Sequence, residues 1–377
     1  MSGRVEMEVE IDREDLFRVI SRVQNIIEKK STMPILSTVL LTAESGILSV
    51  SATDLEMGFQ QKLPVTINKE GSVTIPGRKI FEILRESSSE KISLKEKDNN
   101  WIFISDGNAR YNLASFSADE FPGLVEPEDV PEIEIEGRVL NEMIDKTIYA
   151  VTAEDAGYKL SGIFTEIVEG EQGKMLRMVA TDGHRLSLID KHVENVEALD
   201  LPSGIMIPRK AMIEISKIGS ESEKIHFGFK NKYCVVRKEN LILTVRLLES
   251  KFPDYSMVIP KETPILLNLS KNILIESMRR MLILSNERYR AVKMSFEGDK
   301  MELVSTNPDV GDVQENLDVS YGGRKMEIGF NPKYFVDALQ SMESHNITLG
   351  FKDESKPCIL KGEADAGFLA LMMPMRI

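Results

Sequence analysis

The sequence has few of the residues on which metal sites, disulfide frameworks and nucleophilic catalysis depend. It contains two cysteines, four histidines and one tryptophan among 377 residues. Cys234 and Cys358 stand alone in apolar, strand-like runs, which is typical of buried reduced thiols. The histidines are widely spread, and no HExxH, CxxC or GxxxxGKS/T pattern occurs. We therefore expect no bound metal ion and no other cofactor.

Long apolar runs are also missing. No stretch approaches the roughly 20 apolar residues that a membrane-spanning helix needs. The first residues, "MSGRVEMEVEIDRED", are too charged for the core of a signal peptide. Hydrophobic residues still make up 42% of the chain, and its length exceeds the size at which single cores tend to split. We expect a soluble cytoplasmic protein with several domains and no membrane partner.

Four landmarks recur in the same order in each third of the chain. They are an amphipathic helix pattern, strand-like runs ending in a polar turn, a second helix beginning with proline and lysine, and a hairpin-like pair of alternating runs. The threonines of the polar turns are 128 and 125 residues apart, at Thr53, Thr181 and Thr306. The lysines of the second helices are 131 and 123 residues apart, at Lys79, Lys210 and Lys333. This spacing indicates an internal repeat.

The repeat predicts three similar α+β domains of about 126 residues each. We place them at 1–127, 128–256 and 257–377. Linker-like segments with prolines, at 126–137 and 258–269, lie next to these boundaries. The residues between the landmarks differ, so the three repeats share an architecture rather than a sequence.

Positive charge gathers in the expected helices. The formal net charge is −13. The six helical segments together carry +7, which leaves −20 for the rest of the chain; they are 13–30, 78–86, 138–149, 209–217, 271–290 and 333–343. Such helices suit phosphate binding without base reading, since no recognition-helix, zinc-finger or aromatic stacking pattern accompanies them. Ordinary solvated surface helices would give the same pattern.

The polar turn of the second repeat, in "VATDGHRLSL" (179–188), combines hydroxyl, carboxylate and imidazole groups. Thr181, Asp182 and His184 suggest a hydrolase, but a triad also needs an oxyanion site, and no glycine-rich loop accompanies them. The other repeats have "TDLEM" and "TNPDV" at this place, so the fold does not require the histidine. A structural turn explains Thr181, Asp182 and Gly183, because Thr and Asp hydrogen-bond their own backbone and glycine permits positive φ.

Along its whole length the chain resembles the bacterial DNA polymerase III beta subunits, the sliding clamps. The matching stretches are "MPILSTVLL" (33–41), "TDLEMG" (53–58), "ATDGHRL" (180–186), "IPRK" (207–210), "FPDY" (252–255), "ILSNERYR" (283–290), "MEIGFN" (326–331) and the terminal "MPMRI". The final Ile377 replaces the leucine usual in relatives. The resemblance implies a head-to-tail homodimer with three clamp domains per chain, closed as a six-domain ring around duplex DNA. Helices line the hole, antiparallel sheets lie outside, and the ring has no catalytic activity.

The resemblance also implies a groove that takes short linear peptides from the replicative polymerase, the clamp loader and repair proteins. Its residues, carried over by position, are Leu160, Thr181, Gly183, His184, Arg185, Leu186, Pro253, Val258, Asn331, Tyr334, Leu371, Met373, Pro374, Met375 and Arg376. His184 and Arg185 would form its polar edges. Gly157 stands where many relatives have arginine, which alters the polar rim. The implied contacts to double-stranded DNA are Lys30, Arg78, Tyr158 and Lys159.

Three hypotheses follow. The first is a processivity factor, a DNA-encircling homodimer that slides along DNA and tethers polymerases. The second is a stand-alone peptide-binding adaptor that never encircles DNA, which would leave the basic helices unexplained. The third is a hydrolase using Thr181, Asp182 and His184.

Overall fold

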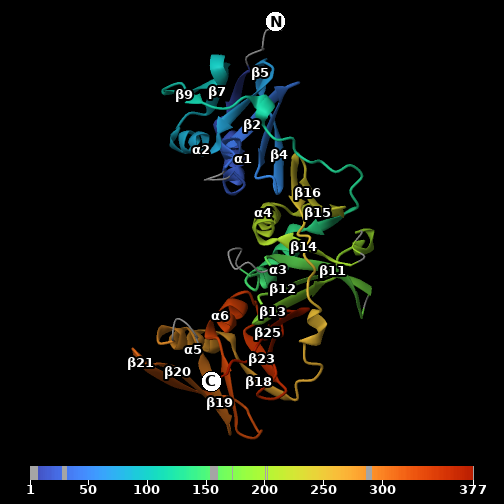
Figure 1. Cartoon of the computed structure of the whole chain (residues 1–377), viewed down its shortest axis with the longest axis vertical. Coiled ribbons are helices and arrows are strands. Elements are labelled where there is room, and N and C mark those ends of the chain that lie inside the picture. Colours follow the sequence, from blue (N-terminus) through green and yellow to red (C-terminus); the bar gives the residue numbers. More distant parts are fainter. Residues whose placement is uncertain are drawn as a thin grey trace. The chain divides into compact units, whose positions relative to one another are not determined.

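The computed structural model describes residues 7–27, 32–152, 160–171, 173–199, 201, 203–285 and 291–376. The chain folds as two compact units (Figure 1). Unit 1 comprises Met1–Glu134 with Lys224–Arg246, and unit 2 comprises Ile135–Glu223 with Leu247–Ile377. Among the helices of these described residues, none is long and apolar enough to cross a membrane.

All six expected helices are present in the described part. They are α1 (Arg13–Arg22), α2 (Gly77–Glu86), α3 (Gly137–Ile148), α4 (Arg209–Ser220), α5 (Lys271–Ile283) and α6 (Pro332–Gln340). α1 is shorter than the predicted segment 13–30, because the chain tightens into a 3-10 turn at Val23–Asn25. Leu16 and Ile20 of α1 are nevertheless buried, and so is Ile27 beyond the 3-10 turn. α5 was expected to reach residue 290, and residues 286–290 lie outside the described ranges.

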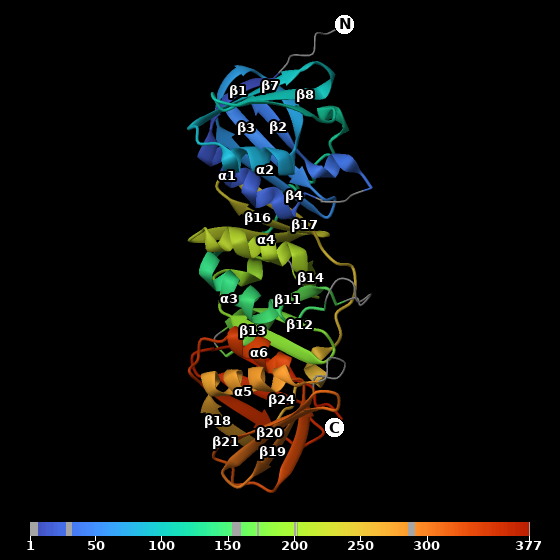
Figure 2. The ribbon, with the colours of Figure 1, turned by 90° about the vertical axis from the view of Figure 1, so that its left-hand side faces the viewer.

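The helices pack in pairs, and each pair comes from one repeat. α1 packs on α2, α3 on α4, and α5 on α6 (Figure 2). The proline-and-lysine start of each second helix is confirmed: Pro76 and Pro208 cap α2 and α4, and Pro332 is the first residue of α6. Proline suits these positions because the first backbone N–H groups of a helix have no partner within it.

The strands of the described residues form four antiparallel sheets. In order across each sheet, the first contains β5 (Thr66–Lys69), β1 (Glu8–Asp12), β7 (Lys91–Lys97), β8 (Trp101–Ser105) and β9 (Arg110–Ala114). The second contains β10 (Glu132–Glu136), β15 (Lys224–Lys230), β16 (Tyr233–Lys238), β17 (Leu241–Arg246), β4 (Met57–Pro64), β3 (Ile47–Thr53), β2 (Thr38–Glu44) and β6 (Gly71–Pro76). The third contains β14 (Ile205–Pro208), β11 (Gly162–Gly170), β12 (Gly173–Thr181), β13 (Arg185–Lys191), β25 (Phe368–Met372), β24 (Cys358–Gly362), β23 (Asn346–Phe351) and β18 (Ile265–Ser270). The fourth contains β21 (Gly311–Asp318), β20 (Lys300–Asn307), β19 (Val292–Glu297) and β22 (Met326–Phe330).

Two of these sheets run from one repeat into the next. In unit 1, β4 pairs with β17 and Phe59 lies opposite Leu243. In unit 2, β13 pairs with β25 and Leu186 lies opposite Leu371. Each junction therefore joins the strand after a polar turn to the second strand of a closing hairpin. Because the sheets cross between repeats in this way, the two compact units do not coincide with thirds of the chain.

The cores are apolar, and both cysteines lie in them. Cys234 and Cys358 are free and buried, as expected, and burial raises the pKa of both thiols. One ion pair is buried as well. Lys146 of α3 is 1% exposed, and its Nζ lies 2.6 Å from Oδ1 of Asp365, which is 2% exposed and belongs to the β24–β25 hairpin. The pair joins the second repeat to the third within unit 2.

Breaking this pair should destabilise unit 2. Lys146→Met leaves Asp365 buried without its cation, and we expect a loss of about 3–5 kcal/mol in the free energy of unfolding. Lys300→Gln is the control, because it removes an exposed pair with Asp318 and should cost less than about 1 kcal/mol. Urea denaturation followed by circular dichroism measures both. Equal losses in the two variants would contradict the assigned role.

The same pair makes stability depend on pH in acid. Burial by itself raises the pKa of Asp365, but Lys146, Ser344 and two backbone N–H groups together hold it below its ordinary value. A carboxyl with a lowered folded pKa contributes stability above its unfolded pKa of about 3.9 and loses that contribution as pH falls through the folded value. The stability difference between the unmodified protein and Lys146→Met should therefore shrink below about pH 4.

Candidate functional site

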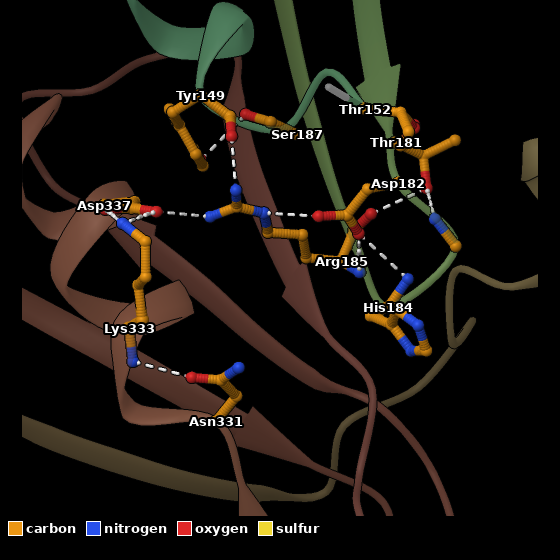
Figure 3. A network of polar contacts seen from close by, with 11 residues as sticks. Tyr149, Thr152, Thr181, Asp182, His184, Arg185, Ser187, Asn331, Lys333 and Asp337 are labelled. Carbon is orange, nitrogen blue, oxygen red and sulfur yellow. Dashed lines mark hydrogen bonds and ion pairs between the residues drawn. The ribbon is translucent and has the colours of Figure 1, made fainter. Parts of the chain in front are cut away.

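The polar turn of the second repeat is closed by its own side chains (Figure 3). The Thr181 hydroxyl donates to the carbonyl oxygen of Arg185 at 2.6 Å and accepts from the N–H of Gly183 at 3.1 Å. Oδ1 of Asp182 accepts from the N–H groups of His184 and Arg185 at 3.0 and 3.1 Å. Gly183 has a φ of 86°, which glycine adopts without strain. The side chains of Thr181 and Asp182 thus supply hydrogen-bond partners to backbone groups of the turn.

The first repeat builds the same turn from the same threonine–aspartate pair, followed by different residues. The Thr53 hydroxyl donates to the carbonyl of Met57 at 2.7 Å and accepts from the N–H of Leu55 at 3.0 Å. Oδ1 of Asp54 accepts from the N–H groups of Glu56 and Met57 at 3.0 and 2.6 Å. The turn is therefore an element of the architecture, and Met57 holds the place that Arg185 holds in the second repeat.

The Arg185 side chain contacts one residue of the turn and others outside it. Its Nε lies 2.9 Å from Oδ2 of Asp182, its Nη1 lies 2.7 Å from Oδ2 of Asp337 in α6, and its Nη2 donates to the carbonyl of Tyr149. The guanidinium carbon lies 4.6 Å from the ring centre of Tyr334 and 5.5 Å from that of Tyr149. With these neighbours the Arg185 side chain is only 10% exposed. Burial raises the pKa of both tyrosines.

An apolar cluster lies beside the turn. Its buried members are Val179, Leu186, Leu188, Met206, Phe252 and Leu371. Half-buried side chains pack against them, namely Leu160, Phe164, Leu248, Tyr255, Ile259, Leu369 and Met373. The structure thus brings together four of the residues that the family resemblance assigns to a groove, Leu160, Leu186, Leu371 and Met373. Adaptable leucine and methionine side chains suit the docking of varied apolar groups.

The segment that follows β17 covers one side of the apolar cluster and is held there by two aromatic residues. The ring of Phe252 stacks on that of Phe164, with centres 4.8 Å apart and planes 5° from parallel. The Tyr255 hydroxyl donates to Glu166 and accepts from Nη1 of Arg177 at 3.1 Å. Burial, followed by Glu166, raises the pKa of Tyr255 to about 12. Pro253 and Val258, both exposed, are placed by these anchors.

The end of the chain is tied to the turn. The N–H of Met373 donates to the carbonyl of His184 at 2.9 Å, and the N–H of Met375 donates to that of Gly329 at 2.8 Å. Pro374 between them is half-buried, and Arg376 is exposed.

α6 begins at this site. Oδ1 of Asn331 caps the helix by accepting from the N–H of Lys333 at 3.0 Å, and Tyr334 follows on the first turn. All fifteen residues of the expected groove belong to unit 2.

Of the four expected DNA contacts, Arg78 alone lies in the described residues. Its side chain is 67% exposed near the start of α2, with Nε 3.5 Å from Oε1 of Glu82. It borders a cavity of 520 Å³ between α1 and α2 that Phe17 and Phe81 also line. Lys30, Tyr158 and Lys159 lie outside the described residues, as does Gly157.

Sequence reasoning missed two features of the site. Asp337 has a local partner, since Lys333 lies four residues before it and its Nζ is 2.9 Å from Oδ1. That spacing indicates a helical ion pair but says nothing about Arg185, which is 152 residues away in sequence. The stacking of Phe252 on Phe164 likewise has no local signal. In the part of the chain that the structure describes, no group of His, Cys, Asp or Glu could hold a metal ion.

Comparison with known proteins agrees with this geometry. The chain matches the family models of the DNA polymerase III beta subunit, with the N-terminal domain over residues 7–125, the central domain over 134–254 and the C-terminal domain over 256–376. It is 31% identical to the beta sliding clamp of Caulobacter vibrioides and 30% identical to that of Escherichia coli K12. Both alignments cover 98% of this chain and 100% of the relative.

Solved structures give the same answer. A crystal structure of the Caulobacter crescentus beta sliding clamp, with polyethylene glycol at its beta-motif tethering region, superposes with a TM-score of 0.92 at 30% identity over 99% of this chain and 100% of that one. A clamp of Bartonella birtlesii bound to griselimycin gives the same four values. The beta subunit from Thermotoga maritima gives 0.90 at 28% identity, over 98% and 100%.

Three clamp-domain matches in order along one chain define a sliding clamp of the bacterial replication machinery. The chain belongs to the family of DNA polymerase III beta subunits, the beta sliding clamps. This family is the non-catalytic part of the polymerase, a processivity factor that acts as a ring around DNA.

The shared turn generates a matched pair of predictions. Thr181→Val leaves the Gly183 N–H and the Arg185 carbonyl without their hydroxyl partner and should lower the free energy of unfolding by about 1–3 kcal/mol. Thr53→Val should cost a similar amount in the first repeat, because the hydrogen bonds are the same. Urea denaturation measures both. An unchanged midpoint in either variant would show that its turn does not depend on the hydroxyl.

Proposed function

We propose that the chain is the DNA polymerase processivity factor of its organism. Two copies close head to tail as a ring around duplex DNA, slide along it without reading sequence, and tether the replicative polymerase, the clamp loader and repair proteins. The observation that carries this proposal is the pairing of strands between repeats, β4 with β17 and β13 with β25. The protein would act in the cytoplasm, without metal or cofactor.

The domain boundaries that we propose remain 1–127, 128–256 and 257–377. They are supported by the family models, whose matches end at residue 125 and begin at 134 around the first boundary, and end at 254 and begin at 256 around the second.

The pairing pattern points to the dimer contact. Within the chain, β4 pairs with β17 and β13 pairs with β25. β21 is the equivalent of β4 and β13, because it follows the polar turn of the third repeat. β9 is the equivalent of β17 and β25, because it is the second strand of the first closing hairpin. In the described residues, β9 and β21 are each the last strand of their own sheet.

We infer that β21 of one protomer pairs with β9 of its partner. Unpaired strand edges promote uncontrolled association, and two such contacts would cover both edges at once. A head-to-tail contact of this kind closes into a ring only when the rotation per subunit divides a full turn, which six similar domains satisfy. Charge favours the pairing too, since Arg110 on β9 is exposed and Asp312 on β21 is exposed.

Hydrogen–deuterium exchange tests this contact. Backbone amides of β9 and β21 should exchange at least about tenfold more slowly in concentrated dimer than in samples diluted below the dissociation constant, because pairing buries them. The amides of β5, the other edge of the first sheet, are the internal control and should not change. Concentration-independent exchange of β9 and β21 in a protein that sediments as a dimer would rule out this interface.

DNA binding would depend on the helices. Their lysines and arginines would meet phosphates without base contacts, which gives weak, salt-dependent, sequence-independent binding. We propose Lys30, Arg78, Tyr158 and Lys159 as contacts; the exposure of Arg78 supports its place among them. A ring needs little affinity because topology retains it, whereas a stand-alone adaptor would have no use for these charges.

Retention on DNA distinguishes a ring from an adaptor. The protein is loaded on a nicked circular plasmid by the organism's own loader, and its release is followed with and without one linearising cut. A topological link predicts rapid loss only after the cut. Similar retention on both forms would mean ordinary affinity binding and would overturn the ring. Lys30→Glu with Arg78→Glu should weaken loading without weakening peptide binding.

The peptide-binding surface that we propose contains Leu160, Thr181, Gly183, His184, Arg185, Leu186, Pro253, Val258, Asn331, Tyr334, Leu371, Met373, Pro374, Met375 and Arg376. The apolar cluster supports it, because half-buried leucine and methionine side chains lie beside exposed polar ones such as His184. Partners would insert apolar side chains of short linear segments there. Glycine at position 157 leaves one side of the polar rim without an arginine, so partners would rely more on apolar contacts.

A further inference from the structure

We propose that Arg185 and Asp337 form a clasp that positions the peptide-binding surface without touching the peptide. The clasp holds the start of α6 against the polar turn (Figure 3). This inference rests on the proposed function and deepens it. It assigns Asp337, a residue outside the family-derived set, to peptide binding, and it changes the role of Arg185 from contact to positioning residue.

The turn itself does not need Arg185. In the first repeat Met57 occupies the same place, and the four hydrogen bonds that close the turn are the same. Met57 is 2% exposed and offers no charge. The charge of Arg185 therefore serves something that the second repeat has and the first lacks. That feature is the contact with α6.

Three of the five N–H groups of the Arg185 guanidinium already have protein partners. Each of its three nitrogens has a protein partner, in Asp182, Asp337 and the Tyr149 carbonyl. Its faces lie against the rings of Tyr334 and Tyr149. A peptide side chain would have to displace one of these neighbours to reach it. His184, the neighbouring residue, is exposed and remains available.

The contact joins the two sides of the proposed surface. On one side, the turn carries His184 and leads into Leu186. On the other, α6 carries Asn331 at its cap and Tyr334 in its first turn. The pairing of β13 with β25 sets the floor of the surface, whereas α6 packs mainly on α5 of its own repeat.

α6 is incompletely packed against its neighbours, so the clasp can affect its position. α6 borders a cavity of 690 Å³ that α3 and α4 also line, and both Tyr149 and Asp337 face it. Because α6 is not closely packed on α3 and α4 at this pocket, its contact with Arg185 beside the pocket has more influence on the position of the helix. The Asp337 side chain is 16% exposed, so its ion pair with Arg185 is shielded from solvent. A preformed surface binds more tightly because less ordering is needed on binding.

Five variants test the clasp in the full-length protein, and one of them, Asp337→Glu, keeps the charge of Asp337. Arg185→Met copies the first repeat, and Asp337→Asn keeps the shape of the side chain while removing its charge. The double variant combines them. Lys333→Gln is the matched control, because Lys333 is the other cationic partner of Asp337. The Lys333 side chain is 46% exposed. The probe is a fluorescein-labelled peptide carrying the clamp-binding segment of the organism's own replicative polymerase, with griselimycin as competitor.

We expect Arg185→Met and Asp337→Asn each to weaken binding of the peptide about tenfold in Kd, equal to about 1.4 kcal/mol. The double variant should be no weaker than either single one, because both changes break the same contact. Asp337→Glu should restore most of the affinity, and Lys333→Gln should bind normally. Hydrogen exchange of α6 amides, measured without peptide, should quicken in Asp337→Asn and remain unchanged in Lys333→Gln.

Two outcomes would overturn the clasp. Weak binding by Arg185→Met with normal binding by Asp337→Asn would make Arg185 a direct peptide contact. Multiplied losses in the double variant would mean that the two residues act separately. Failure of the unmodified protein to bind the peptide would overturn the proposed peptide-binding function itself, and the α6 exchange rates would still report whether the contact holds the helix. An unchanged urea midpoint in each variant would show that weaker peptide binding comes from lost positioning and not from loss of folding.

Discussion

Backbone hydrogen bonds between strands of different repeats are the constraint on which the rest of this structure depends. A strand edge must be paired, covered or shielded, and each repeat has one edge strand after its polar turn and another in its closing hairpin. Within the chain, two such edges meet two others, at β4–β17 and β13–β25. It leaves β9 and β21 as the last strands of their sheets in the described residues, the edges through which we propose that a second copy joins.

The peptide-binding surface that we propose forms at one of these junctions. Pairing of β13 with β25 brings Leu186 of the second repeat beside Leu371 of the third, and Phe252 closes the cluster from the connecting segment. A surface made from two repeats is only as well defined as their junction. The buried Lys146–Asp365 pair and the Arg185–Asp337 pair both cross it, one inside the core and one at the edge of the binding surface.

The repeats, the six helices and the closing hairpins were predictable from sequence, because periodic apolar residues and turn residues act over short distances. The polar turn was predictable too, since Thr181 and Asp182 bond their immediate neighbours. Contacts between distant segments were not. Nothing near Arg185 identifies Asp337, and the helix pattern did not reveal that α1 would end at Arg22. The groove residues came from family resemblance, and the strand register that brings Leu186 to Leu371 followed only from the folded chain.

Two turns of the chain are closed by the same hydrogen bonds although their fourth and fifth residues differ. This has a consequence for how such a chain changes over generations. In both turns the threonine and aspartate supply the side-chain oxygens that close the loop, and the fourth and fifth positions contribute backbone groups to this closure. Arg185 adds a side-chain contact to Asp182 that Met57 cannot make. Glu56 and Met57 fill those positions in one copy, His184 and Arg185 in the other. Selection can therefore alter these two side chains in one copy at small cost to folding, while the duplicate turn elsewhere keeps its original form. After duplication, the residues that keep the turn folded and the residues that can acquire partners are different positions of the same turn.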